Sequence, residues 1–132
     1  MSEDDVAVVR ANSQAFSDRD VERMLSYYAP DADVVDRRAM GLGSFRGHDE
    51  LRRYYSSIFN STDAMREHLE VLAARDGVVV AGAELWARLA GDTAGAGFTT
   101  PYGMVLHLRD GLITLLEVYT DGAEALAASG LA

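Results

Sequence analysis

The chain has 132 residues, no Cys, and 21 Asp and Glu against 12 Lys and Arg, which gives a formal net charge of -9. This length predicts one domain, residues 1–132, with a core of its own, and the lack of Cys excludes disulfides and thiol catalysis. The acidic balance argues against nucleic acid or an anionic membrane as the partner. Since no apolar run approaches the ~20 residues of a membrane span and the start has no signal-like pattern, we expect a soluble, cytoplasmic protein.

The first half of the chain has the apolar spacing of three helices. They are expected near residues 3–16, at 21–28 behind the N-cap residue Asp20, and from after Gly47 to about Phe59. The third helix is the most amphipathic, because its large apolar residues recur at i, i+3, i+4, i+7 and i+8. Pro30 ends the second helix, and a short strand at 32–36 and an irregular loop at 37–46 follow.

From His68 onward the apolar period changes to that of strands. Four strands are expected at residues 68–75, 78–89, 98–109 and 112–121, joined by Asp76-Gly77, a Gly-rich segment at 91–97, and Asp110-Gly111. Short connections favour an antiparallel meander. Helices followed by strands are typical of an α+β domain in which the helices pack on one face of a bent sheet.

The last predicted strand carries our first catalytic candidate, Asp121. Read at period two, Asp121 shares a face with Tyr119 and Glu117, and neither face of the strand is properly polar. Something should therefore cover both faces, helices on one side and a second subunit on the other. An acid at the end of such a strand could present its carboxylate to an enclosed ligand; alternatively, Asp121 caps the turn at residues 122–124.

Three further residues are candidates for acid/base chemistry. Asp36 ends the short strand, although Arg37 and Arg38 follow it and could form a surface ion pair with it. Glu84 alternates with Trp86 on one strand face, which is either a pocket wall or a solvated or dimer face. His68 is a third candidate; the alternative is a solvent-facing or hydrogen-bonded His without a catalytic role. Single imidazoles such as His68 and His107 lack ligand spacing, so we predict no metal site.

Polar and aromatic residues at core spacing are expected to form the wall of a binding pocket. Asn12 falls inside the apolar stripe of the first helix, where a polar amide must find partners. The aromatic and Met side chains bury large areas, either in the core or around a ligand. The predicted substrate-binding set is Asn12, Phe16, Tyr54, Phe59, Trp86, Tyr102, Met104 and Tyr119.

The order of these segments, together with four local sequences, resembles the NTF2-like superfamily and its SnoaL-like branch. The local sequences are Ala15-Phe16-Ser17-Asp18-Arg19-Asp20-Val21, Tyr28-Ala29-Pro30-Asp31-Ala32-Asp33-Val34, Phe45-Arg46-Gly47, and Asp110-Gly111-Leu112-Ile113 running into Tyr119-Thr120-Asp121. The resemblance implies a cystatin-like cone, with a curved antiparallel sheet wrapped around three N-terminal helices, an apolar pocket and a homodimer through the outer sheet face. The superfamily hosts polyketide cyclases, isomerases, dehydratases, epoxide hydrolases and non-catalytic binders.

The resemblance also implies roles for single residues. Asp36 matches the catalytic base of ketosteroid isomerase-like members, and Asp121 matches the last-strand acid of limonene epoxide hydrolase-like members. His68 corresponds to a His of the scytalone dehydratase type. Two family patterns are incomplete in this chain. Where the isomerases have a Tyr and an acid as oxyanion donors, this chain has Asn12 and roughly Gly103. Where the epoxide hydrolases have Arg-x-Asp, this chain has Gly82-Ala83-Glu84, which keeps only the acid.

We therefore expect a cofactor-free enzyme that uses pocket carboxylates for cyclisation, isomerisation or epoxide opening of a hydrophobic, polyketide- or terpenoid-like substrate. In a cyclase, Asp121 would remove a proton next to a carbonyl, while Asn12, His68 or a Tyr donates to the oxyanion. In epoxide opening, Asp121 would share the roles with Glu84 or Asp36. The alternative, favoured by the incomplete catalytic patterns, is a non-catalytic ligand-binding or accessory dimer.

Overall fold

The computed structural model describes residues 2–39, 41, 43–92 and 95–131. The elements in this part of the chain, four helices and six strands, confirm the predicted α+β class. In chain order they are α1 (Ser2–Ser17), α2 (Val21–Leu25), β1 (Tyr28–Asp36), β2 (Ser44–Arg46), α3 (Gly47–Asn60), β3 (Thr62–Arg75), β4 (Val78–Leu89), β5 (Phe98–Arg109), β6 (Leu112–Tyr119) and α4 (Gly122–Ser129).

The strands form one curved sheet in the order β2-β1-β6-β5-β4-β3. The meander from β3 to β6 is antiparallel as predicted, and among the described strands β1 and β6 are the parallel pair. The turn Asp76-Gly77 connects β3 to β4 and the turn Asp110-Gly111 connects β5 to β6, and both residues of each turn have positive φ. Two successive residues of this kind make the tight turn whose twist matches that of the flanking strands.

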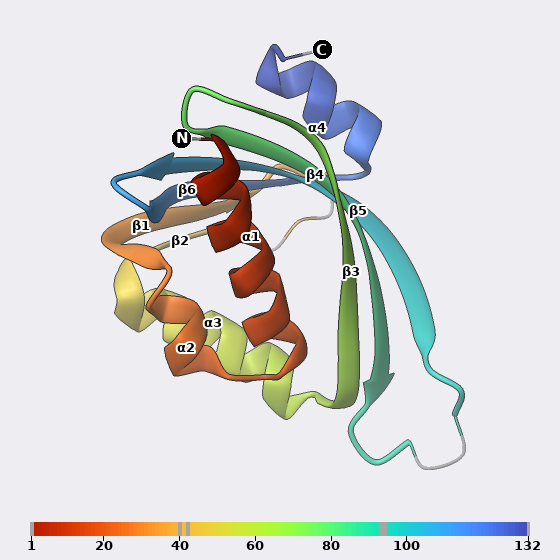
Figure 1. Ribbon diagram of the computed structural model, residues 1–132. Helices are drawn as coiled ribbons and strands as arrows, with labels where there is room; N and C mark the ends of the chain where they lie inside the picture. Colours follow the sequence, from red (N-terminus) through yellow and green to blue (C-terminus); the bar gives the residue numbers. More distant parts are fainter. Residues whose placement is uncertain (1, 40, 42, 93–94, 132) are drawn as a thin grey trace.

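Helices α1, α2 and α3 lie inside the curve of the sheet (Figure 1). On α3 the buried residues Leu51, Tyr55 and Phe59 are four positions apart, so one stripe of the helix faces the core. Asp20 caps α2 by accepting a hydrogen bond from the backbone of Arg23. Arg19 joins the start of α2 to the end of α3, because its guanidinium donates to the carbonyl of Phe59. The expected sheet wrapped around three N-terminal helices is confirmed.

The Ala-rich segment after β6 forms a fourth helix, α4, which packs on the outer face of the sheet (Figure 1). It covers a small outer core formed by Val80, Val105 and Ala125. The helix approaches the sheet closely at Gly103, where a Cβ atom would lie 2.1 Å from the carbonyl oxygen of Asp121. Part of the outer face, which we expected a second subunit to cover, is therefore covered by this chain's own helix.

Several element boundaries differ from the prediction. Helix α2 ends at Leu25 rather than residue 28, because Tyr28 already pairs with Ile113 of β6. Strand β3 starts at Thr62, six residues before the predicted start. The predicted loops at 37–46 and 91–97 contain positions 40, 42, 93 and 94, which lie outside the described residues. In the described part of the chain, no helix is both long and apolar enough to span a membrane.

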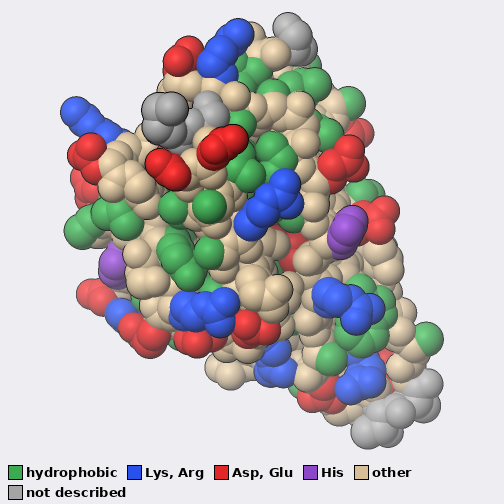
Figure 2. All heavy atoms as spheres, viewed as in Figure 1, with side chains coloured by type: hydrophobic (Ala, Val, Ile, Leu, Met, Phe, Trp, Pro, Cys, Tyr) green, Lys and Arg blue, Asp and Glu red, His purple; other side chains and the backbone are tan. Residues whose placement is uncertain are grey.

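The surface carries both charge signs. On the face that Figure 2 shows, acidic and basic side chains are interspersed among apolar ones. Several of them form ion pairs, such as Arg52 with Glu22 and Arg23 with Asp18. Such exposed pairs contribute little to stability.

Candidate active site

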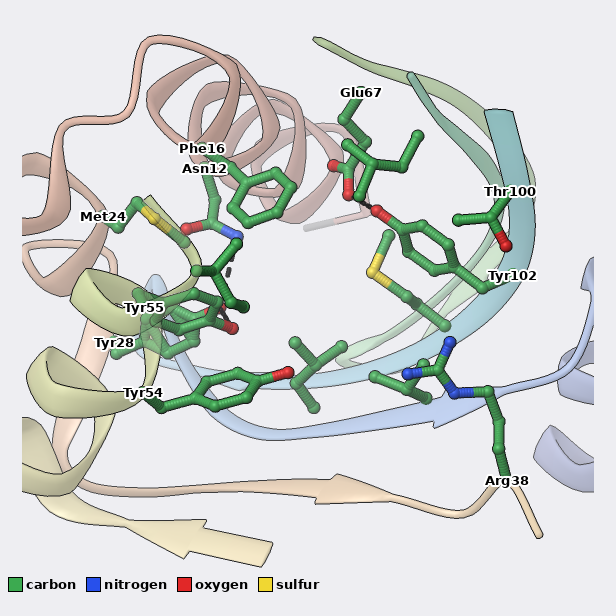
Figure 3. A pocket seen from close by; sticks show the side chains of 15 residues that line it. Asn12, Phe16, Met24, Tyr28, Arg38, Tyr54, Tyr55, Glu67, Thr100 and Tyr102 are labelled. Atoms are coloured by element: carbon green, nitrogen blue, oxygen red, sulfur yellow. Dashed lines mark hydrogen bonds between the residues drawn. The ribbon is translucent and has the colours of Figure 1, made fainter. Parts of the chain in front are cut away.

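A cavity of about 280 Å³ lies between the helices and the concave face of the sheet. Its walls are mostly apolar and aromatic, with a few polar groups directed inward (Figure 3). Such a combination is typical of small-molecule sites. The lining residues are Asn12, Phe16, Met24, Tyr28, Arg38, Tyr54, Tyr55, Ile58, Glu67, Leu85, Thr100, Tyr102, Met104, Leu116 and Val118.

Glu67 places a carboxyl group on this mostly apolar wall. In β3 it shares the inner side with Met65, Leu69 and Val71, because alternate residues of a strand face the same way. Ser13 of α1 donates a hydrogen bond of 2.6 Å to Oε1 of Glu67. The hydroxyl of Tyr102 contacts the other carboxyl oxygen, Oε2 (Figure 3). The carboxyl group is therefore held in place by a helix on one side and by β5 on the other.

Burial raises the pKa of Glu67 to about 7, against the opposing effect of the Ser13 hydrogen bond. The Tyr102 hydroxyl can donate to a carboxylate or accept from a carboxylic acid, so it can accompany either protonation state. Near neutral pH both forms of Glu67 are populated. A carboxyl group in this state can take up and release protons at the working pH of an enzyme.

Asn12, Tyr28 and Tyr55 form a polar network on another side of the cavity. The Asn12 amide donates to the Tyr28 hydroxyl over 3.3 Å, and the hydroxyls of Tyr28 and Tyr55 are 3.4 Å apart. Burial raises the pKa of Tyr28 to about 12 and that of Tyr55 well above 10. These phenols therefore stay protonated at neutral pH and can act as hydrogen-bond donors.

Arg38 supplies a positive charge at the edge of the cavity. Its Nε and Nη2 donate to the two carboxylate oxygens of Asp36, over 2.9 and 2.7 Å. The Asp36 side chain is only 4% exposed, whereas that of Arg38 is 33% exposed. Figure 3 shows the guanidinium turned toward the cavity. Asp36 thus lies behind Arg38 and orients it.

Comparisons with known proteins agree with this geometry. The sequence profile of the SnoaL-like domain matches residues 8–116. The chain belongs to the SnoaL-like domain family. No curated protein matches the sequence. Solved structures, in contrast, resemble this SnoaL-like domain over nearly its whole length.

Three solved structures illustrate this likeness. TerC, co-crystallised with polyporic acid, has a TM-score of 0.75 at 23% identity, over 92% of this chain and 94% of TerC. An NTF2-like protein of Burkholderia pseudomallei also scores 0.75 at 23% identity, over 94% and 95%. A ketosteroid isomerase-like protein of Catenulispora acidiphila, in complex with trimethylamine, scores 0.74 at 20% identity, over 93% and 92%. These identities show the fold alone, which is NTF2-like as predicted.

Five of the predicted substrate-binding residues line the cavity of the SnoaL-like domain. They come from α1, α3 and β5: Asn12, Phe16, Tyr54, Tyr102 and Met104. Phe59 is buried behind this wall, where its ring lies 5.7 Å from that of Phe16. Trp86 and Tyr119 lie outside the lining. The Trp86 ring stacks under the guanidinium of Arg66, and the Tyr119 hydroxyl donates to Glu117.

The four predicted catalytic residues do not converge on the cavity. Asp121 is exposed and caps α4, with its carboxylate accepting from the Glu124 backbone over 2.8 Å. Side chains of a strand alternate between its two faces, which explains this position. Leu116 and Val118 of β6 line the cavity, so the residues that alternate with them, including Asp121 beyond the end of the strand, face outward. His68 and Glu84 are exposed cross-strand partners in β3 and β4. Asp36 is buried but is engaged by Arg38. Their catalytic roles stay predictions.

Glu67 is the acid that the sequence interpretation missed. The predicted strand began at His68, one residue too late to include it. Extending the period-two pattern backward would have placed Glu67 in phase with Leu69 and Val71, as a charged residue on an apolar face. Among the residues that the structure describes, no three His, Asp or Glu side chains are grouped to hold a metal ion.

Proposed function

We propose that the protein is a cofactor-free enzyme in which Glu67 transfers protons at carbon atoms next to a carbonyl group of a small hydrophobic substrate. The observation that carries this proposal is the buried Glu67 carboxyl group, held by Ser13 and Tyr102 in the wall of an apolar cavity. Strongly raised carboxyl pKa values in a cleft are characteristic of functional sites. The pKa of about 7 allows one group to act first as base and then as acid.

The proposed step conserves protons. The Glu67 carboxylate takes a proton from the carbon next to the carbonyl, and the electron pair of the broken C–H bond forms an enolate. Returning the proton to a different carbon isomerises the substrate. If the enolate carbon instead attacks a second carbonyl, a ring closes, and Glu67 gives its proton to the new alkoxide. Cyclisation and isomerisation thus share one first step.

The lining supports proton transfer more than it supports epoxide opening. Opening an epoxide by water needs one group to protonate the ring oxygen and another to activate water. Among the described residues, Glu67 is the only acid that lines the cavity. Asp36, a further candidate, lies outside the lining and accepts two hydrogen bonds from the Arg38 side chain.

Exchange of the acidic protons of 2-tetralone in deuterated buffer, followed by proton NMR, tests the proposal. We expect the wild-type protein to accelerate exchange over buffer and Glu67→Gln to lose roughly a hundredfold or more of that acceleration, the usual contribution of a general base. Glu84→Gln, which makes the same change on the outer face, should keep the wild-type rate. If Glu67→Gln exchanges as fast as wild type, Glu67 is not the base. If the wild type binds 2-tetralone without accelerating exchange, the protein is the non-catalytic ligand-binding protein of the alternative hypothesis.

The homodimer expected from the resemblance remains part of the proposal. Since α4 already covers Val80 and Val105, a second copy would have to use the rest of the outer sheet face. That region includes His68, Glu84 and Trp86.

A further inference from the structure

We infer that the cavity selects ligands in which a hydrophobic ring system carries an anionic oxygen group, such as a carboxylate, and that Arg38 binds this group. The inference deepens the proposed function by naming the substrate class and rests on the same cavity. Its readout is binding, so it can fail or succeed independently of proton transfer by Glu67.

The donor pattern of Arg38 is the first support. A guanidinium has five N–H donors in a rigid plane. Asp36 occupies the donors on Nε and one on Nη2. In the described part of the chain, no acceptor is hydrogen-bonded to Nη1. Because Arg38 lines the cavity, the remaining N–H groups are available to an oxygen anion that enters it (Figure 3).

The second support is that the guanidinium is oriented before a ligand arrives. Two short, charge-assisted bonds to a buried carboxylate hold its plane. The loop also packs closely on Asp36, since a Cβ atom at Gly41 would lie 2.7 Å from its Oδ1. A donor held in this way loses little side-chain freedom on binding, which favours affinity.

The surroundings of Arg38 strengthen a charged hydrogen bond. Met104, Leu116 and Val118 line the cavity with apolar surface, and a hydrogen bond against such a surface is electrostatically stronger than one in bulk water. The Tyr54 hydroxyl points into the cavity; burial and, to a lesser degree, the charge of Asp36 raise its pKa, whereas the charge of Arg38 lowers it. Tyr54 can therefore donate a second hydrogen bond to the same anionic group.

The charge state of Glu67 should control how well an anion binds. Around Glu67, α1 contributes the neutral Asn12 and Ser13, while β1, α3 and β5 contribute tyrosines, and Arg38 is always charged. Burial raises the pKa of the tyrosines on β1 and α3, Tyr28, Tyr54 and Tyr55, above 10. As pH rises through about 7, Glu67 ionises and repels a bound anion.

Calorimetric titration with 2-naphthoate and its neutral analogue 2-naphthamide tests the inference. At pH 6 we expect wild type to bind the carboxylate roughly tenfold more tightly than the amide, the range of a net charge-assisted hydrogen bond. Arg38→Met should abolish this preference. Arg37→Met is the matched control, because it makes the same charge change at a surface residue paired with Glu117. Its preference should stay at the wild-type level.

Removing the Arg38 guanidinium leaves the buried Asp36 carboxylate without this ion pair and could destabilise the fold, so two further variants are needed as controls. Arg38→Lys keeps the charge and should retain part of the preference, and Asp36→Asn combined with Arg38→Met removes the pair together and should show none. In wild type the carboxylate preference should fall as pH rises from 6 to 8, and in Glu67→Gln it should not. Equal binding of both probes by wild type, an unchanged preference in Arg38→Met, or binding of neither probe would each overturn the inference.

Discussion

The buried carboxyl group of Glu67 should make the stability of the protein depend on pH, and Glu67→Gln isolates this effect. Burial raises the pKa of Glu67 from 4.5 to about 7. The folded state therefore holds the proton more tightly than the unfolded state does, and stability is lost as pH rises through about 7. A tenfold difference in proton affinity corresponds to about 1.4 kcal/mol, so ionising Glu67 costs the folded protein about 3 kcal/mol.

Urea unfolding of both proteins, followed by far-ultraviolet circular dichroism from pH 4.5 to 9, measures this cost. Glutamine stays neutral throughout, and the other titrating groups are common to both proteins. The free energy of unfolding of Glu67→Gln minus that of wild type should therefore rise by about 3 kcal/mol over this range. Glu84→Gln, at an exposed position, should show almost no such rise. A difference between Glu67→Gln and wild type that does not change with pH would refute the link between burial and proton affinity.

Four further outcomes test the cap of α4, its packing and the predicted dimer. Asp121→Ala removes the cap of α4 and should lower the free energy of unfolding by about 1 kcal/mol. Asp121→Asn should leave 2-tetralone exchange unchanged, whereas a loss of most exchange would return Asp121 to the mechanism. Gly103→Ala brings a Cβ atom onto the Asp121 carbonyl and should cost about 1–3 kcal/mol in urea unfolding, so wild-type stability would contradict the close packing of α4. Light scattering after gel filtration should give the mass of a dimer; a monomer mass at every concentration tested would rule out the predicted homodimer.

Much of the fold follows from local signals along the chain. Periodic apolar residues place α1, α3 and three of the long strands, and the Asp-Gly pairs place the tight turns. These features depend on neighbours in the chain, so a single sequence carries them. The boundaries that moved, such as the start of β1, depend on pairing with distant strands. Tyr28 extends β1 because Ile113 offers a partner more than 80 residues later.

The site depended more strongly on tertiary structure. Five lining residues could be predicted because aromatic and polar residues on apolar faces mark a pocket wall. The acid that faces the cavity could not be predicted. A strand turns alternate residues to opposite sides, and the sequence does not say which side is enclosed. Glu67 interrupts the apolar face of a strand, and Asp121 follows the end of another. Only the packing of α4 over one face, and of α1 over the other, leaves Asp121 in solvent and buries Glu67.

The sequence by itself determined the fold class, because local periodicity and turn residues encode it, and the types of residue available for chemistry. The NTF2-like topology was expected from the resemblance to that superfamily. The tertiary structure alone decided that Glu67 meets Ser13 and Tyr102, and that Asp36 positions Arg38 at the cavity. The contacts of Glu67 join residues 35 and 54 positions apart in the chain. The pKa of a carboxyl group depends on what surrounds it in space, and that surrounding exists only once the sheet has curved around the helices.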